Sequence, residues 1–246
     1  MYSIFKGGFA VKKIAYNLIL PFTFAAVLLW SIIGVSQDRS FFAQQYGQNN
    51  TAQVTGIQQQ DLMSITDGLL KYMLGSRENL DMQFEINGEM REIFDQREKL
   101  HMVDVHILYK NVILIAAGIS LICCAAAVYL AKCDSVKKVK QILRKKYIPS
   151  LIGFAVFIGA LGVIIAVNFQ WFWTVFHEII FTNDLWLLDP NYSIMINMFP
   201  LEFFFNMCLQ IIIVSVLWCF VVRLVLIDFN SLPKWIKSRR KFKDQM

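Results

Sequence analysis

Four long apolar stretches, each of about 20 residues, decide what this 246-residue chain can fold into. A helix of that length crosses a hydrocarbon core of about 30 Å, and it pairs its own backbone groups where no water is present to bond them. The chain is 57% hydrophobic and its mean hydropathy is +0.49, which is typical of a polytopic membrane protein. The expected fold is therefore all-α, with four transmembrane helices at 15–35, 111–131, 147–167 and 207–226.

The charges between these stretches indicate how the helices are oriented. Residues 1–14, 132–146 and 223–246 together hold 17 Lys or Arg and three acids, whereas 36–110 and 168–206 hold seven basic and 15 acidic residues. The positive-inside rule then places both termini in the cytoplasm and the two acidic segments on the extracytoplasmic side. The first stretch lacks a small-x-small cleavage site, so we expect an uncleaved anchor. The basic excess favours anionic lipid headgroups and gives no reason to expect nucleic-acid binding.

Cysteines and short motifs indicate neither a disulfide framework nor a cofactor. Four of the five cysteines lie within apolar stretches and Cys133 lies at the cytoplasmic edge, so the outer segments have none. The chain has no HExxH, no glycine-rich phosphate loop and no GxSxG motif. His101 and His106, five residues apart, would not face one ion on a helix. We therefore expect no metal and no cofactor.

The two outer segments have different characters. Residues 37–60 are rich in Gln and Asn and are expected to be extended or loosely turned. From Asp61 the apolar residues recur at helical intervals, which predicts an amphipathic helix that lies on the membrane surface or covers a cavity. A second helix is expected to begin near Ile86 and to run straight into the second span. The aromatic segment 168–206 is expected to form a re-entrant or interfacial element between the third and fourth spans.

All three histidines lie in these outer segments, close to the ends of spans. His101 and Asp104 share a face of a continuous helix, whereas His106 is turned away from them and is interpreted as structural. A carboxylate beside an imidazole fixes its tautomer and raises its basicity, as in general-base catalysis. The alternative is that His101, Asp104 and His177 are merely interfacial polar residues. The predicted topology returns His177 to the membrane level of His101, so both imidazoles can converge on one site.

Further candidates have weaker patterns. Tyr72, with Lys71 and Arg77 beside it, is a candidate for contacting a phosphate or carbonyl group, or is a surface residue. Two interpretations are open for Asn183, Trp186 and Asp189. They belong to a substrate site, or they only end a helix and form the turn that follows it.

Two sequence blocks, LHMVDV at 100–105 and FHEIIFTNDLWLLDP with MFPLEFFFN at 176–206, resemble the lipoprotein intramolecular transacylases (Lit), a family of four-span bacterial integral membrane proteins. One departure from the family pattern is Ser193, whose position is often acidic. The resemblance implies an enzyme that moves the sn-2 acyl chain of a diacylglyceryl-cysteine lipoprotein onto the cysteine α-amine, giving a lyso-form lipoprotein. It implies no cofactor, a bacterial cell-membrane location, membrane lipids as surroundings and a monomer.

The resemblance also implies roles for individual residues. His101 and His177 would be the catalytic acid and base, in an order that the sequence leaves open, and Asp104 would orient His101. Asn183 or a loop amide would stabilise the oxyanion, while Phe176, Trp186 and Asp189 would contact substrate. Tyr72, which lies outside the two blocks, is a further candidate substrate contact from its position in the sequence alone. Two other functions stay open from the residues themselves. One is a non-catalytic accessory or sensor protein that binds a partner through its outer segment, and the other is a metal-dependent lipid hydrolase.

Overall fold

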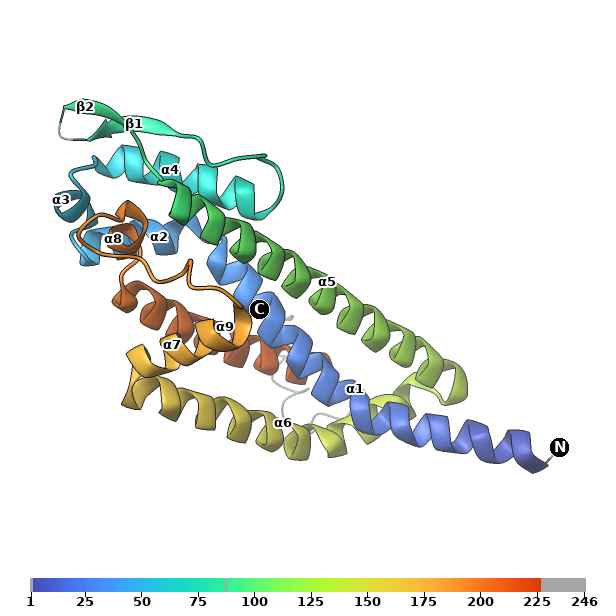
Figure 1. Cartoon of the computed structure of the whole chain (residues 1–246). Helices are drawn as coiled ribbons and strands as arrows, with labels where there is room; N and C mark the ends of the chain where they lie inside the picture. Colours follow the sequence, from blue (N-terminus) through green and yellow to red (C-terminus); the bar gives the residue numbers. More distant parts are fainter. Residues whose placement is uncertain (1, 87, 227–246) are drawn as a thin grey trace, which may run out of the picture. The chain divides into compact units, whose positions relative to one another are not determined.

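The computed structural model describes residues 2–86 and 88–226, and four long helices dominate that part of the chain (Figure 1). They are α1 (Tyr2–Ser36), α5 (Gln96–Cys133), α6 (Val136–Val167) and α9 (Leu201–Leu226). Each contains one of the four predicted apolar stretches and is long and apolar enough to cross a membrane. The prediction of an all-α membrane protein with four spans is confirmed.

The chain divides into two compact units. Among the described residues, the smaller unit comprises 2–25, 119–156 and 216–226, and the larger unit comprises 26–86, 88–118 and 157–215. The basic residues 227–246, which contribute to the predicted orientation, lie outside the described residues.

In the larger unit, the Gln- and Asn-rich segment is helical, so the prediction of an extended chain at 37–60 is wrong. It forms α2 (Arg39–Gln48) and α3 (Thr51–Thr55). Asp38 caps α2 by accepting a hydrogen bond from the Ser40 amide at 2.9 Å. The chain leaves α3 through Gly56, whose φ of 69° suits glycine at a helix end. Burial of Phe41, Phe42 and Tyr46 from α2 outweighs the modest helix propensity of the segment.

The apolar face of α4 (Gln59–Met73) packs inside the protein and not against a membrane surface. Leu62 and Ile65 are fully buried, and Leu69 is nearly so. They belong to a hydrophobic core that also contains Phe94, Met198 and Phe203. The Tyr46 hydroxyl bonds that of Thr66 at 2.6 Å within this core, which satisfies two buried polar groups. Phe94 and Met102, which lie on either side of the first turn of α5, share this core with Met195 and Met198 of α8 (Ile194–Met198).

A β-hairpin stands where a helix was expected to begin near Ile86. Strands β1 (Gln83–Ile86) and β2 (Glu89–Glu92) pair antiparallel, and Gly88 has a φ of 87° at the turn. Asn87–Gly88 is the dipeptide most typical of a two-residue hairpin turn, which explains the interruption. Helix α5 begins ten residues later, at Gln96, and continues as predicted into the second apolar stretch. The aromatic segment forms α7 (Phe169–Ile180) and the short α8.

Candidate functional site

His101 of α5 and His177 of α7 meet inside the larger unit. Their ring centroids are 6.1 Å apart and their planes are inclined by 34°. His101 is 8% exposed and His177 is 6% exposed, so both rings are withdrawn from solvent. Two imidazoles from distant parts of the chain are thus brought into one buried cluster.

The hydrogen bond made by His177 identifies its free nitrogen. Its Nδ1 lies 2.7 Å from the backbone carbonyl oxygen of Trp173, one turn earlier in α7. Because a carbonyl oxygen only accepts, Nδ1 must carry the proton, and in the neutral ring the lone pair is on Nε2. Burial lowers the pKa of His177 from its ordinary value of 6.5, so the ring is neutral at pH 7 and has a basic nitrogen available.

Aromatic rings enclose this pair. Trp173, Trp186 and Phe176 have their ring centroids 4.7, 4.9 and 5.3 Å from that of His177. Phe181 contacts both imidazoles, at 5.5 Å from His177 and 5.4 Å from His101. Such walls exclude water and lower the local dielectric constant, which strengthens charge interactions inside the site. Trp186 and Phe176 were predicted from sequence, whereas Phe181 and Trp173 were not singled out.

Asp104 does not hold His101 by a hydrogen bond in the described part of the chain, contrary to the expectation that it orients the ring. Its Oδ2 accepts a 2.8 Å bond from Asn183 Nδ2. The Asn183 Oδ1 in turn accepts from the Leu185 amide at 3.0 Å. The Asp104 carboxylate therefore acts on His101 through its charge and not through a hydrogen bond, and Asn183 ties the loop after α7 to α5.

Glu98 is the residue that sequence reasoning missed. It lies one turn before His101 and is only 1% exposed. Its Oε1 accepts from Ser193 Oγ at 2.5 Å and from the Met195 amide at 2.9 Å. Its Oε2 accepts from the Asp95 amide at 2.7 Å, while Asp95 Oδ1 accepts from the Glu98 amide at 2.8 Å. This reciprocal pair is a capping box that starts α5, and the other oxygen of Glu98 holds the start of α8.

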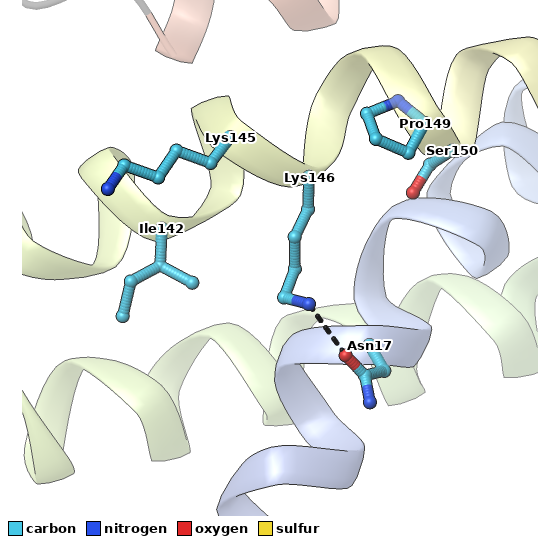
Figure 2. A pocket seen from close by; sticks show the side chains of 6 residues that line it. All are labelled: Asn17, Ile142, Lys145, Lys146, Pro149 and Ser150. Carbon is cyan, nitrogen blue, oxygen red and sulfur yellow. Dashed lines mark hydrogen bonds between the residues drawn. The ribbon is translucent and has the colours of Figure 1, made fainter.

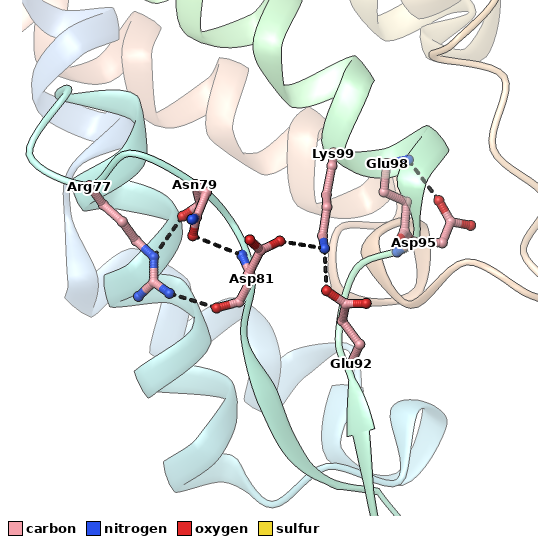
Figure 3. A network of polar contacts seen from close by, with 7 residues as sticks. All are labelled: Arg77, Asn79, Asp81, Glu92, Asp95, Glu98 and Lys99. Atoms are coloured by element: carbon pink, nitrogen blue, oxygen red, sulfur yellow. Dashed lines mark hydrogen bonds and ion pairs between the residues drawn. The ribbon is translucent and has the colours of Figure 1, made fainter.

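Figure 3 shows how this start of α5 is braced on its exposed side. Lys99 bonds the carboxylates of Asp81, at 2.7 Å, and of Glu92. Arg77 holds the backbone carbonyls of Asn79 and Asp81 at 2.7 and 2.9 Å. The Asp-x-x-Glu spacing at 95–98 is itself a signal for a helix start, and it identifies Glu98 once the hairpin is recognised. Arg77, a candidate substrate contact, braces this connection instead.

The remaining candidates, Tyr72 and Asp189, contact neither imidazole of the pair among the described residues. The backbone carbonyl of Tyr72 accepts a 2.9 Å bond from His106 Nδ1, and their ring centroids are 5.3 Å apart. This contact supports the structural interpretation of His106. Asp189 organises the turn before α8, where its Oδ1 accepts from both the amide and the side chain of Asn191 at 2.9 and 2.8 Å.

The outer face of α7 carries a shallow hollow of about 170 Å³. Trp171 and Ile179 line it and are 56% and 75% exposed. Phe176 lines it too and also packs on His177, so this apolar surface reaches the buried pair. Within residues 2–86 and 88–226, no group of three His, Cys, Asp or Glu side chains could hold a metal ion.

Four membrane-length helices and a buried pair of imidazoles characterise an integral membrane protein with one candidate functional site described above. The family model "Lipoprotein intramolecular transacylase Lit" matches residues 17–204, which is most of the chain. The chain belongs to the lipoprotein intramolecular transacylase family and is a membrane-integral acyltransferase.

Solved structures agree with this assignment at the level of the fold. The membrane-integral Lit from Bacillus cereus is 20% identical, with a TM-score of 0.68 over 94% of this chain and 99% of that chain. A variant of the same protein with histidine replaced by alanine is 19% identical, with a TM-score of 0.65 over 98% of this chain and 100% of that one. A histidine-to-arginine variant is 20% identical, with a TM-score of 0.64 over 98% and 97%. No curated protein matched this chain.

Proposed function

We propose that this enzyme moves the sn-2 acyl chain of a diacylglyceryl-cysteine lipoprotein to the cysteine α-amine. The nitrogen forms an amide bond with the acyl carbon, the ester C–O bond breaks, and the glycerol oxygen leaves as a hydroxyl. The reaction therefore takes one proton from nitrogen and gives one to oxygen. The observation that carries the proposal is the pair of buried imidazoles, with ring centroids 6.1 Å apart, because they can perform both transfers.

His177 is the base in this proposal. Its Nδ1 hydrogen is committed to the Trp173 carbonyl, so only Nε2 can accept the proton of the attacking amine. An α-amine has an ordinary pKa of about 7.7–8, which lies close enough to that of an imidazole for transfer during attack. Trp173 thereby acts as a positioning residue through its backbone.

His101 is the acid, because the Asp104 carboxylate favours its protonated form. Burial and the neighbouring His177 outweigh that effect and lower the pKa of His101 to about 4, so the ring is neutral at pH 7 and must first take up the proton that His177 removes from the amine. Two imidazolium ions about 6 Å apart repel by about 3 kcal/mol at an effective dielectric constant of about 20. The two rings are therefore protonated one at a time, and the amine proton passes from His177 to His101 and from His101 to the glycerol oxygen. Asn183 keeps Asp104 in place and has a second amide hydrogen that can stabilise the tetrahedral oxyanion.

The larger contribution to rate is geometric. The amine and the ester belong to one substrate molecule, and holding them in a near-attack arrangement can supply about 7–11 kcal/mol of the barrier. Phe176 and the apolar hollow of α7 would hold the acyl chains, with Trp186 closing the other side of His177. The peptide part of the lipoprotein would remain in water. This arrangement fits a monomer with cytoplasmic termini and an extracytoplasmic active site.

The test uses purified enzyme and a synthetic diacylated lipopeptide. Because the product is an isomer of the substrate, its total mass is unchanged and the readout must report the free amine. We expect amine-reactive labelling to disappear and tandem mass spectrometry to place the acyl chain on the N-terminal residue. Release of free fatty acid with the amine still reactive would instead indicate hydrolysis. Loss of acyl transfer on treatment with EDTA would contradict a mechanism that rests on imidazoles alone.

A further inference from the structure

A second cavity lies within the smaller unit. It measures about 620 Å³ and is lined by Asn17 of α1 and by Ile142, Lys145, Lys146, Pro149 and Ser150 of α6 (Figure 2). Binding pockets for small molecules commonly measure about 300–1,000 Å³. The cavity is thus large enough for the headgroup of a lipid.

The cationic side chains of this cavity have no acidic partner. Among the described residues, Lys145 and Lys146 make no ion pair, and the Lys146 ammonium donates instead to Asn17 Oδ1 at 2.7 Å. The nearest acid in sequence, Asp134, is already engaged by Lys12 at 2.6 Å and Lys138 at 2.7 Å. The cavity therefore presents two positive charges that no acidic side chain of residues 2–86 and 88–226 pairs with.

Pro149 contributes to the opening of the cavity. Proline has no backbone N–H, so the carbonyl of Lys145 lacks its usual helical partner within α6. Figure 2 shows Pro149 and Ser150 on the helix turn that follows the two lysines, with Ser150 directed toward α1. The cavity thus combines ammonium groups with a side-chain amide and a hydroxyl, which together suit a phosphate and the hydroxyls of a headgroup.

The helix surfaces that continue from the cavity into the apolar stretches carry exposed apolar side chains. On α6, Ile152 and Val156 follow Pro149 at helical spacing and are 58% and 67% exposed. On α1, Leu18 and Phe22 are 43% and 37% exposed. These side chains suit acyl chains and offer nothing to a soluble anion. Basic pockets between membrane helices are known sites for anionic headgroups.

We propose that this cavity binds one anionic phospholipid, with its phosphate between Lys145, Lys146, Asn17 and Ser150 and its acyl chains along α1 and α6. This site is independent of the acyl-transfer proposal. It differs from general attraction to the basic surface because it assigns binding to two of the seven basic residues in 132–146.

Native mass spectrometry of the full chain in detergent, titrated with phosphatidylglycerol, tests the assignment. We expect the double variant Lys145→Gln/Lys146→Gln to bind roughly thirtyfold more weakly than wild type, given the attraction typical of a lysine at a membrane surface. The matched control is Lys132→Gln/Lys137→Gln, which removes the same charge from exposed positions outside the cavity. It should bind as wild type does, and the exposed Lys145 alone can be replaced if the double variant fails to fold.

Three outcomes would overturn the site. Equal weakening by both double variants would show general surface attraction. Equal binding of phosphatidylcholine would show that the charge is not recognised, and displacement by millimolar inorganic phosphate would show a site for a free anion and not a lipid.

Discussion

Replacing Glu98 by alanine removes the acceptor of three hydrogen bonds at the start of α5. Two of the donors, the Ser193 hydroxyl and the Met195 amide, belong to residues that are 4% and 6% exposed, so water cannot easily replace the carboxylate. The third donor, the Asp95 amide, belongs to an exposed residue and can turn to water.

Leaving a buried donor unsatisfied costs about 1–3 kcal/mol, so the two buried donors together cost at least about 2 kcal/mol. For a protein of this size, that loss lowers Tm by roughly 4 °C or more. Glu98→Gln keeps one carbonyl oxygen as an acceptor and should lose clearly less. Glu85→Ala is the matched control, because Glu85 is exposed on β1 and its side chain makes no hydrogen bond or ion pair among the described residues.

The assay is the thermal unfolding of purified protein in detergent, followed by intrinsic tryptophan fluorescence. We expect the order of Tm to be Glu85→Ala equal to wild type, then Glu98→Gln, then Glu98→Ala. If Glu98→Ala unfolds within about 1 °C of wild type, the three bonds are not holding α8 to α5 and the reasoning is refuted.

Further predictions concern the site itself. Burial lowers the pKa of His177 below 6.5, so as the pH falls the unfolded chain binds a proton there before the folded chain does. The folded state should therefore lose stability as the pH falls from about 6.5 toward that lowered pKa. Tm measured between pH 7 and 5 should fall less steeply in His177→Gln than in wild type. The acyl-transfer rate should rise with pH toward about 8, as the substrate amine loses its proton, and a rate that increases on acidification would contradict His177 as base. Asp104→Asn keeps an acceptor for Asn183 but removes the charge, so kcat should fall, roughly tenfold, at unchanged Tm; unchanged kcat would show that the carboxylate only ties the loop. His106→Ala, which removes a contact with Tyr72, should leave kcat unchanged in the same lipopeptide assay, and a large loss would move His106 into the site.

The spans were predictable because length and hydropathy alone decide whether a helix can cross a bilayer. The meeting of His101 with His177 was also within reach, since the alternation of sides returns both segments to one membrane level. The hydrogen bonds around the two imidazoles were not predictable from the sequence. Spacing suggested that Asp104 would bond His101, but the loop after α7 supplies Asn183 as a competing partner. Only the path of that loop decides between them.

Other errors came from tertiary packing that overrides local pattern. The composition of the Gln-rich segment predicts a loose chain, but burial of Tyr46 in the core favours a helix there. The absence of Gly and Pro from 89–117 predicts a helix from near Ile86, but the Asn–Gly sequence favours a hairpin turn, and α5 begins only after that hairpin. A helix that begins near Ile86 would place Glu98 in its interior. Glu98 can be recognised as a capping residue only when it lies in the first turn of the helix. Ser193 is its buried partner.

The central claim is that two imidazoles move the protons of one acyl transfer. Its most direct test is the rate at which His101→Gln and His177→Gln convert a diacylated lipopeptide, read by tandem mass spectrometry of its N-terminal residue with folding checked by Tm. Each replacement should lower the rate by at least about a hundredfold. A folded variant of either histidine that still transfers the acyl chain at the wild-type rate would contradict the two-imidazole mechanism.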